Sequence, residues 1–197
     1  MVKKLKEEKT LILIKPDGVK RGLVGEVIKR IEQRGLKIVG LQMFQATAKD
    51  ISKHYSTAEA NLKRMGEKAV AGYQKFGMDP KKELGTDDPL KAGKMVHSWL
   101  VEYFTSAPII KMVIQGVQAV EMVRKLVGDT MPAKAEMGTI RGDFSVDSSV
   151  LANSQKRAVR NIVHASGEIE EAKEEILLWF KPEEIHEYKR AEEDIMF

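Results

Sequence analysis

Hydrophobic positions along the first half of the chain follow two spacings, one typical of strands and one typical of helices. An apolar, β-branched run at 10–15 ends at a proline–aspartate–glycine turn at 16–18, which predicts a buried strand followed by a turn. Apolar residues then recur with helical spacing over 23–31, and Gly35 follows where a C-terminal glycine cap belongs. The alternating run at 36–44 predicts a second strand.

The second half of the chain continues this order of elements. Short apolar runs at 109–114 and 159–163 predict strands, and stripes at 119–127 and 169–180 predict helices. The segment 140–146 is interpreted as strand-like or extended around a glycine. The order of strands and helices predicts an α+β sandwich with a ferredoxin-like βαββαβ core, in which helices cover one face of an antiparallel sheet.

Residues 56–95 differ from this alternation. A helix is expected before them, with Thr47 as N-cap and Asp50 three residues later. Within the segment, apolar residues at 62–73 have helical spacing, and several glycines and the turn-rich stretch 85–89 follow. We therefore expect one helix and then a loop, as an insertion in a single domain spanning 1–197.

The composition narrows the function classes. The 197 residues are 43% hydrophobic and 31% charged, which is typical of a globular protein. The absence of cysteine excludes disulfides, thiol catalysis and cysteine-based metal sites. A net charge of +4 suits anionic ligands but is too small to require nucleic acid. No apolar run is long enough to span a bilayer, and residues 1–9 lack a secretory signal pattern, so a cytoplasmic location is expected.

One histidine has surroundings that suggest chemistry. The glycine-rich phosphate-binding motifs are absent, and the four histidines are too dispersed for a histidine-rich metal site. His164, however, ends a predicted strand just before a helix that Ser166 could cap, where backbone N–H groups favour anions. Neutral imidazole is a competent nucleophile, and Glu175 could orient the ring. The alternative from local sequence is a loop histidine without a role.

Other polar residues carry little information individually. Lys15, Arg124 and Arg141 lie at the edges of predicted elements, where each one alone is interpreted as a solvated surface charge. Tyr55, which follows His54, is more often part of a core or rim than of a catalytic site.

Read together, these residues fall into segments that resemble the nucleoside diphosphate kinases. The likeness runs from Thr10 to Tyr188 and includes the histidine motif N-x-x-H-[GA]-S at 161–166. The matching segments, in chain order, are 14–25, 103–108, 124–132, 138–144, 160–166 and 175–184. Because several segments occur in order, the resemblance is highly specific.

The resemblance implies a ferredoxin-like core and transfer of the γ-phosphate from a nucleoside triphosphate to a nucleoside diphosphate through phosphohistidine. It implies His164 as nucleophile, Tyr55 and Glu175 as residues that hold the imidazole, and Ser166 as a supporting neighbour. The phosphate and sugar contacts that it implies are Lys15, Arg124, Thr130, Arg141 and Asn161. It also implies Mg²⁺ held through the nucleotide phosphates rather than by a protein cage, and a homo-oligomer, with a hexamer favoured.

The chain departs from the family pattern at several places. Residues 56–95 fill the place of a short loop, and 145–159 is longer than usual. Val96 stands at the position of the base-stacking phenylalanine, so Trp99 or the insertion is an alternative platform. Ala165 and Gly167 replace a glycine and an aspartate found in many members. The alternatives are a catalytically impaired scaffold and a ferredoxin-like nucleic-acid-binding module, although the aromatic–basic strand motif of the latter is missing.

Overall fold

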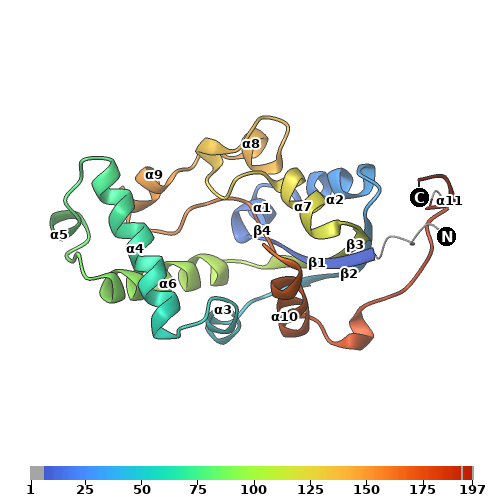
Figure 1. The fold of residues 1–197 in the computed structure, drawn as a ribbon, viewed down its shortest axis with the longest axis horizontal. Helices are drawn as coiled ribbons and strands as arrows, with labels where there is room; N and C mark the ends of the chain where they lie inside the picture. The colour runs from blue at the N-terminus through green and yellow to red at the C-terminus, as the bar shows by residue number, and fades with distance from the viewer. Residues whose placement is uncertain (1–6, 192, 197) are drawn as a thin grey trace, which may run out of the picture.

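A four-stranded antiparallel sheet in the order β2-β3-β1-β4 forms the centre of the protein (Figure 1). The computed structural model describes residues 7–191 and 193–196, so the first six residues of the charged lead-in lie outside the described residues. The strands are β1 (Glu7–Ile14), β2 (Lys37–Phe44), β3 (Ile109–Val117) and β4 (Val163–Ala165). The predicted α+β, ferredoxin-like arrangement is confirmed.

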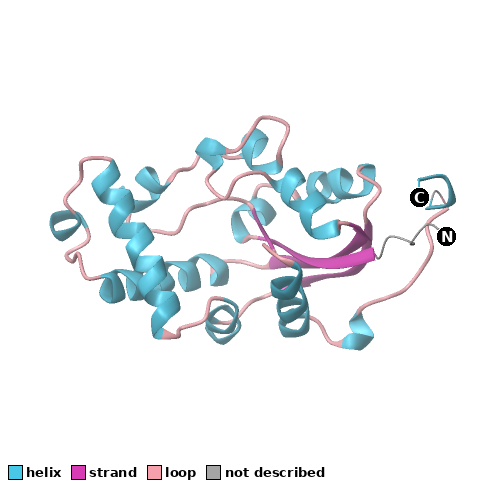
Figure 2. Cartoon of the chain, viewed as in Figure 1, coloured by secondary structure: helices cyan, strands magenta, loops and turns pink. Residues whose placement is uncertain are grey.

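Helices surround this sheet and extend away from it on the side of α4 and α5 (Figure 2). None of those in the described part of the chain is long and apolar enough to cross a membrane. They are α1 (Pro16–Lys20), α2 (Val24–Gln33), α3 (Ala48–His54), α4 (Glu59–Lys75), α5 (Pro80–Glu83), α6 (Pro89–Thr105), α7 (Ala119–Val127), α8 (Ile140–Phe144), α9 (Ser149–Ser154), α10 (Ile169–Trp179) and α11 (Glu193–Met196), with 3-10 turns η1 (Pro132–Lys134) and η2 (Pro182–Glu184).

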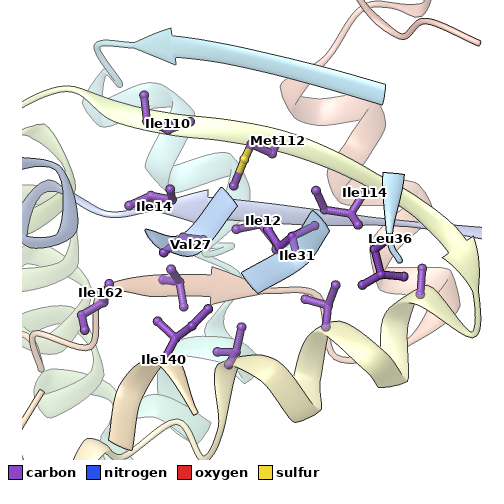
Figure 3. Packing of buried hydrophobic residues seen from close by; sticks show 14 residues of the cluster. Ile12, Ile14, Val27, Ile31, Leu36, Ile110, Met112, Ile114, Ile140 and Ile162 are labelled. Carbon is purple, nitrogen blue, oxygen red and sulfur yellow. The ribbon is translucent and has the colours of Figure 1, made fainter. Parts of the chain in front are cut away.

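The first face of the sheet packs against α2 and α7, as a ferredoxin-like core requires. Ile12 and Ile14 of β1 point to this face and are fully buried against Val27 and Ile31 of α2 (Figure 3). Burying each such aliphatic side chain contributes about 1.5–3 kcal/mol. This layer is the helical face that the sequence pattern predicts.

The second face of the sheet is covered as well. Leu11 and Leu13 alternate with the residues of the first face and pack against Ile51 of α3, Phe104 of α6 and Ile176 of α10. The expectation of helices on one face therefore describes only the pair α2 and α7. The second layer matters for function because it brings α3, α6 and α10 to the end of β4.

Predicted helix termini agree with the structure where local chemistry decides them. Thr47 and Asp50 form a reciprocal capping box at the start of α3. Gly35 follows α2 with a φ of +82°, a conformation that glycine adopts without strain.

Two predictions for the second half are wrong. Segment 140–146 is not extended: Thr139 caps the short helix α8, and its side chain accepts from Gly142 N–H. The predicted strand at 159–163 pairs only from Val163 onward, because Ile162 has a φ of +68° and interrupts the extended backbone.

The segment 56–95 also differs from the expected helix and loop. It contains α4, the short α5 and the first half of α6, and α4 crosses α6 closely. Glycines allow this approach, because a Cβ on Gly66 would lie 1.8 Å from the Pro89 carbonyl oxygen, and one on Gly93 would lie 1.8 Å from the Leu62 carbonyl oxygen. A small core of Tyr73 and its neighbours holds the helices together.

Candidate active site

His164 lies on the short edge strand β4, where it pairs with Leu13 of β1. Its side chain is 15% exposed, so one edge of the ring remains accessible. Burial, and secondarily the charge of Lys15, lower the pKa of His164 to about 3. The imidazole is therefore neutral at physiological pH and has a lone pair available for nucleophilic attack.

A carboxylate fixes the orientation of this ring. The Nε2 atom of His164 lies 2.9 and 3.0 Å from the two carboxylate oxygens of Glu175. Glu175 comes from the buried stripe of α10, and burial raises its pKa. Because a carboxylate accepts hydrogen bonds, the proton of the neutral imidazole is placed on Nε2. Nδ1 has no hydrogen-bond partner among the described residues.

Ser166 supports Glu175 instead of capping α10. Its hydroxyl donates to Glu175 Oε2 over 2.6 Å and accepts from the Leu11 backbone N–H over 3.3 Å. The N-cap of α10 is Glu168, so the predicted cap is wrong. The fully buried serine instead ties the end of β4 to the carboxylate that orients His164.

His54, at the end of α3, belongs to the same cluster. Its ring centroid lies 4.5 Å from that of His164, and its Nδ1 accepts from Trp179 Nε1 over 3.3 Å and lies 3.4 Å from Glu175 Oε1. Burial lowers its pKa to about 3, so this ring is neutral too. Sequence reasoning does not single out His54, because its contacts come from α10 and β4, which are far from it along the chain.

Tyr55 lies beside His164 and Phe104. Its ring centroid is 6.4 Å from that of His164 and 5.7 Å from that of Phe104. No hydrogen bond joins Tyr55 to His164 in the described parts of the chain. Burial raises the pKa of its hydroxyl, which therefore stays protonated and can donate to a ligand.

Two buried cations lie beside this cluster. Lys15, at the end of β1, is 5% exposed and donates to Asn161 Oδ1 over 2.6 Å. Burial lowers its pKa to about 7. Arg141 of α8 is 6% exposed and donates to the carbonyl oxygens of Gly128, Asn161 and Val163. Both are therefore positioned by the fold rather than free on the surface.

Asn161 connects these cations to the loop after α7. Its side-chain amide donates to the Thr130 carbonyl oxygen over 2.9 Å while its oxygen accepts from Lys15. Thr130 and Arg124 are themselves exposed. Arg124 Nη1 lies 3.2 Å from the place of a Cβ on Gly167, which puts the guanidinium close to the segment that follows His164.

Gly167 leaves space that a glutamate fills. A Cβ there would lie 2.7 Å from Glu171 Oε2, and this oxygen accepts from the Gly167 N–H over 2.5 Å. Glu171 thus places a carboxylate beside position 167, where the chain has glycine instead of the aspartate found in many family members.

Trp99, an alternative base-stacking residue in the sequence analysis, lies away from His164. Trp99 packs against the small core of Tyr73, Leu84 and Ala92. It also lines a cavity of about 720 Å³ whose wall does not include His164. The structure therefore engages Trp99 with the segment 56–95, and base stacking at Val96 or Trp99 stays a prediction.

The chain is similar to known proteins over most of its length. The family model described as nucleoside diphosphate kinase matches residues 8–65 and 89–185. The unmatched stretch 66–88 lies within the segment 56–95. A nucleoside diphosphate kinase of Pyrobaculum aerophilum is 51% identical over 91% of this chain and 98% of its own length. Nucleoside diphosphate kinase A of Mus musculus is 37% identical over 96% and 97%.

Solved structures show the same likeness. The crystal structure of an NDP kinase from Pyrobaculum aerophilum has a TM-score of 0.89 and 48% identity, covering 92% of this chain and all of that one. A transition-state mimic of the nucleoside diphosphate kinase of Borrelia burgdorferi, with bound vanadate and ADP, has a TM-score of 0.75 and 35% identity, covering 95% of each chain.

Proposed function

The chain belongs to the nucleoside diphosphate kinase family and transfers phosphate between nucleoside tri- and diphosphates, and on this premise we propose that Nδ1 of His164 is the nucleophile. The observation that carries the proposal is the contact of Nε2 with Glu175, which leaves Nδ1 as the nitrogen with a free lone pair.

The proposed reaction has two matched steps. Nδ1 attacks the γ-phosphorus, the P–O bond to the β-phosphate breaks, and the nucleoside diphosphate leaves with the bonding electrons. The phosphorylated ring is cationic, and the adjacent Glu175 carboxylate stabilises its Nε2–H. A second nucleoside diphosphate then attacks the phosphorus through a terminal phosphate oxygen, and the P–N bond breaks to restore neutral His164.

We propose that the cations stabilise the charge that spreads over the transferring phosphoryl oxygens. Lys15 and Arg141 are held by backbone and amide oxygens, so little reorganisation accompanies the reaction. Arg124 and Thr130 are exposed and are proposed to meet the phosphates at the open side. Asn161 keeps Lys15 in place, and the Tyr55 hydroxyl remains a candidate donor.

Magnesium is proposed to arrive on the nucleotide. The group of residues whose atoms lie close enough to share a metal ion, His54, His164 and Glu175, offers two imidazoles. Mg²⁺ prefers oxygen ligands, so phosphate oxygens and water suit it better. Glu171, beside Gly167, is a carboxylate that could accept a hydrogen bond from a metal-bound water. When bound, Mg²⁺ neutralises phosphate charge.

A homo-oligomer is proposed on the basis of the sheet edge. Strand β2 lies at the edge, and Leu41 and Met43 on it are 51% and 59% exposed. An exposed apolar edge strand is a template for pairing with another chain, so a second copy is the expected occupant. The hexamer, the cytoplasmic location and the single domain 1–197 with its insertion remain predictions.

Labelling with [γ-³²P]ATP tests the central proposal. The expected product is a phosphoprotein that is labile in acid and stable in base, and His164→Ala should abolish it. Equal labelling of His164→Ala and the unsubstituted protein would show that another residue is the nucleophile.

A further inference from the structure

Ile162, two residues before His164, has an unusual backbone conformation. Its φ is +68°, in the left-handed region that a β-branched residue rarely adopts. Its side chain is fully buried in the core beside Ile140, so the residue cannot relax toward solvent (Figure 3). Such a conformation persists only where the surrounding structure holds it. The contacts that hold Ile162 therefore bear on the geometry of His164.

The chain turns at Ile162 between two residues of the proposed site. On one side, Asn161 accepts from Lys15 Nζ over 2.6 Å, and on the other, His164 follows in β4. The Val163 N–H donates to the Asn161 carbonyl oxygen over 2.7 Å, which closes a three-residue turn around Ile162. This turn therefore sets both the direction of Asn161 and the start of the strand that carries His164.

Asp17, in the first turn of α1, supplies a side-chain contact to this turn. Its Oδ2 accepts from the Ile162 backbone N–H over 3.1 Å. Its Oδ1 accepts from the Tyr103 hydroxyl over 2.5 Å, so the carboxylate is itself fixed from α6. The Lys15 N–H donates to the Ile162 carbonyl oxygen over 2.7 Å. Both backbone polar groups of Ile162 are therefore bound by the segment 15–17.

Close packing on both sides supports the turn. A Cβ on Gly18 would lie 3.0 Å from Ile162 Cγ2 and 3.1 Å from the Ile162 carbonyl oxygen, so α1 lies directly against this residue because glycine stands there. From α8, Arg141 donates to the carbonyl oxygens of Asn161 and Val163. These contacts hold the neighbours of Ile162, whereas Asp17 satisfies its buried N–H.

We propose that Asp17 is a positioning residue, whose carboxylate holds the strained turn at Ile162 and thereby places His164 in line with the transferring phosphate. The proposal rests on the proposed role of His164 as nucleophile. Without the carboxylate, the buried N–H of Ile162 is left unpaired, and the turn relaxes toward a conformation that isoleucine prefers. His164 then leaves the line of attack, and small displacements of a reacting group lower the rate steeply.

Asp17→Ala tests this assignment, with Asp88→Ala as the matched control. Asp88 also accepts from a backbone N–H, that of Lys91 over 2.9 Å, but at the exposed start of α6. We expect Asp17→Ala to slow phosphohistidine formation at saturating ATP about 10- to 100-fold, with KM for ATP changed less than threefold, because the nucleophile is displaced while the nucleotide still binds. Asp88→Ala should leave the rate unchanged.

Two conservative variants separate hydrogen bonding from charge. Burial lowers the pKa of Lys15 to about 7 and the charge of Asp17 opposes this shift, so Asp17 also acts on Lys15 through its charge. Asp17→Asn keeps an acceptor oxygen for the Ile162 N–H without the charge, and should label within fivefold of the unsubstituted protein. Asp17→Glu keeps the charge but moves the acceptor, and should be at least tenfold slower. It also replaces Asp17→Ala if that variant does not fold.

Hydrogen exchange of the Ile162 amide, followed by NMR, reports on the turn without catalysis. It should be more than tenfold faster in Asp17→Ala or Asp17→Glu than in the unsubstituted protein, and nearly unchanged in Asp17→Asn. Unchanged exchange in the first two variants, labelling by them within threefold of the unsubstituted protein, or an Asp17→Asn variant as slow as they are would overturn the proposal. Because exchange needs no phosphoryl transfer, failure of His164 labelling would refute the proposed function separately.

Discussion

Replacing Glu175 by glutamine tests whether the carboxylate beside His164 contributes to the chemical step. Both carboxylate oxygens contact His164 Nε2, and Oε2 also accepts from Ser166. Glutamine has the same shape but offers one acceptor oxygen and no charge. The glutamine NH₂ group must therefore face one of the two donors, the Ser166 hydroxyl or His164 Nε2–H. If it faces Nε2, it forces the histidine proton onto Nδ1.

The magnitude follows from the charge that develops on the ring. Two unit charges about 5 Å apart interact by about 3 kcal/mol at an effective dielectric constant near 20. Neutral His164 gains little from this interaction before the reaction, whereas the phosphorylated imidazolium gains all of it. Since about 1.4 kcal/mol corresponds to a factor of ten, Glu175→Gln should slow phosphohistidine formation about 10²-fold.

Single-turnover labelling measures this step directly. Mixing enzyme with [γ-³²P]ATP should show the slower rate in Glu175→Gln while the KM for ATP changes little, because the lost interaction forms only in the transition state. Glu170→Gln makes the same chemical change on the same helix, at an exposed residue paired with Lys173, and should leave the rate unchanged. A labelling rate within threefold of the unsubstituted protein in a folded Glu175→Gln variant would refute the reasoning.

Three further predictions concern other parts of the structure. Nucleotide binding should take up close to one proton at pH 8 and almost none at pH 6, because a bound phosphate should raise the pKa of Lys15 from about 7. Calorimetry in buffers of different ionisation enthalpy measures this proton uptake, and equal uptake at the two pH values would contradict the prediction. Tyr103→Phe should lower the free energy of unfolding by about 1–3 kcal/mol, because the tyrosine hydroxyl donates to Asp17; an unchanged urea midpoint would argue against this. Gly66→Ala should destabilise the protein by about 1–3 kcal/mol, because the added Cβ clashes where α4 crosses α6. Gly25→Ala, in open space on α2, should not destabilise it. Equal thermal midpoints for the two variants would contradict the close crossing.

The sequence pattern predicts the strands and helices whose apolar faces meet the sheet. Helix α7 agrees with its predicted span because its apolar stripe is regular. The prediction for segment 140–146 is wrong because it interprets Gly142 as part of an extended backbone, whereas Thr139 caps a short helix there. A Cβ on Gly142 would lie 2.0 Å from the Glu136 carbonyl oxygen, so this glycine is required by packing rather than by extended backbone.

The site residues also divide into those that a local pattern predicts and those whose surroundings depend on the fold. A motif with fixed spacing identified His164, whereas Lys15 and Arg141 each looked like surface charges until they were read together. They are buried because Asn161 and the carbonyl oxygens of Val163 and its neighbours satisfy them, and these contacts depend on the fold. His54 had no signal of its own, since its contacts join α3 to α10 and β4.

Burial of the cations suggests how the site favours its substrate. A fall in the pKa of Lys15 from 10.5 to about 7 corresponds to about 5 kcal/mol that disfavours its ammonium form. Arg141, whose pKa burial lowers to about 10, is disfavoured in the same sense. We propose that an anionic phosphate relieves this unfavourable charge when it enters the site, so that substrate binding stabilises the charged forms of Lys15 and Arg141. Burial, and secondarily the charge of Lys15, keeps His164 neutral before the reaction. Glu175 already orients the neutral ring, and we propose that its electrostatic contribution grows when the ring acquires positive charge.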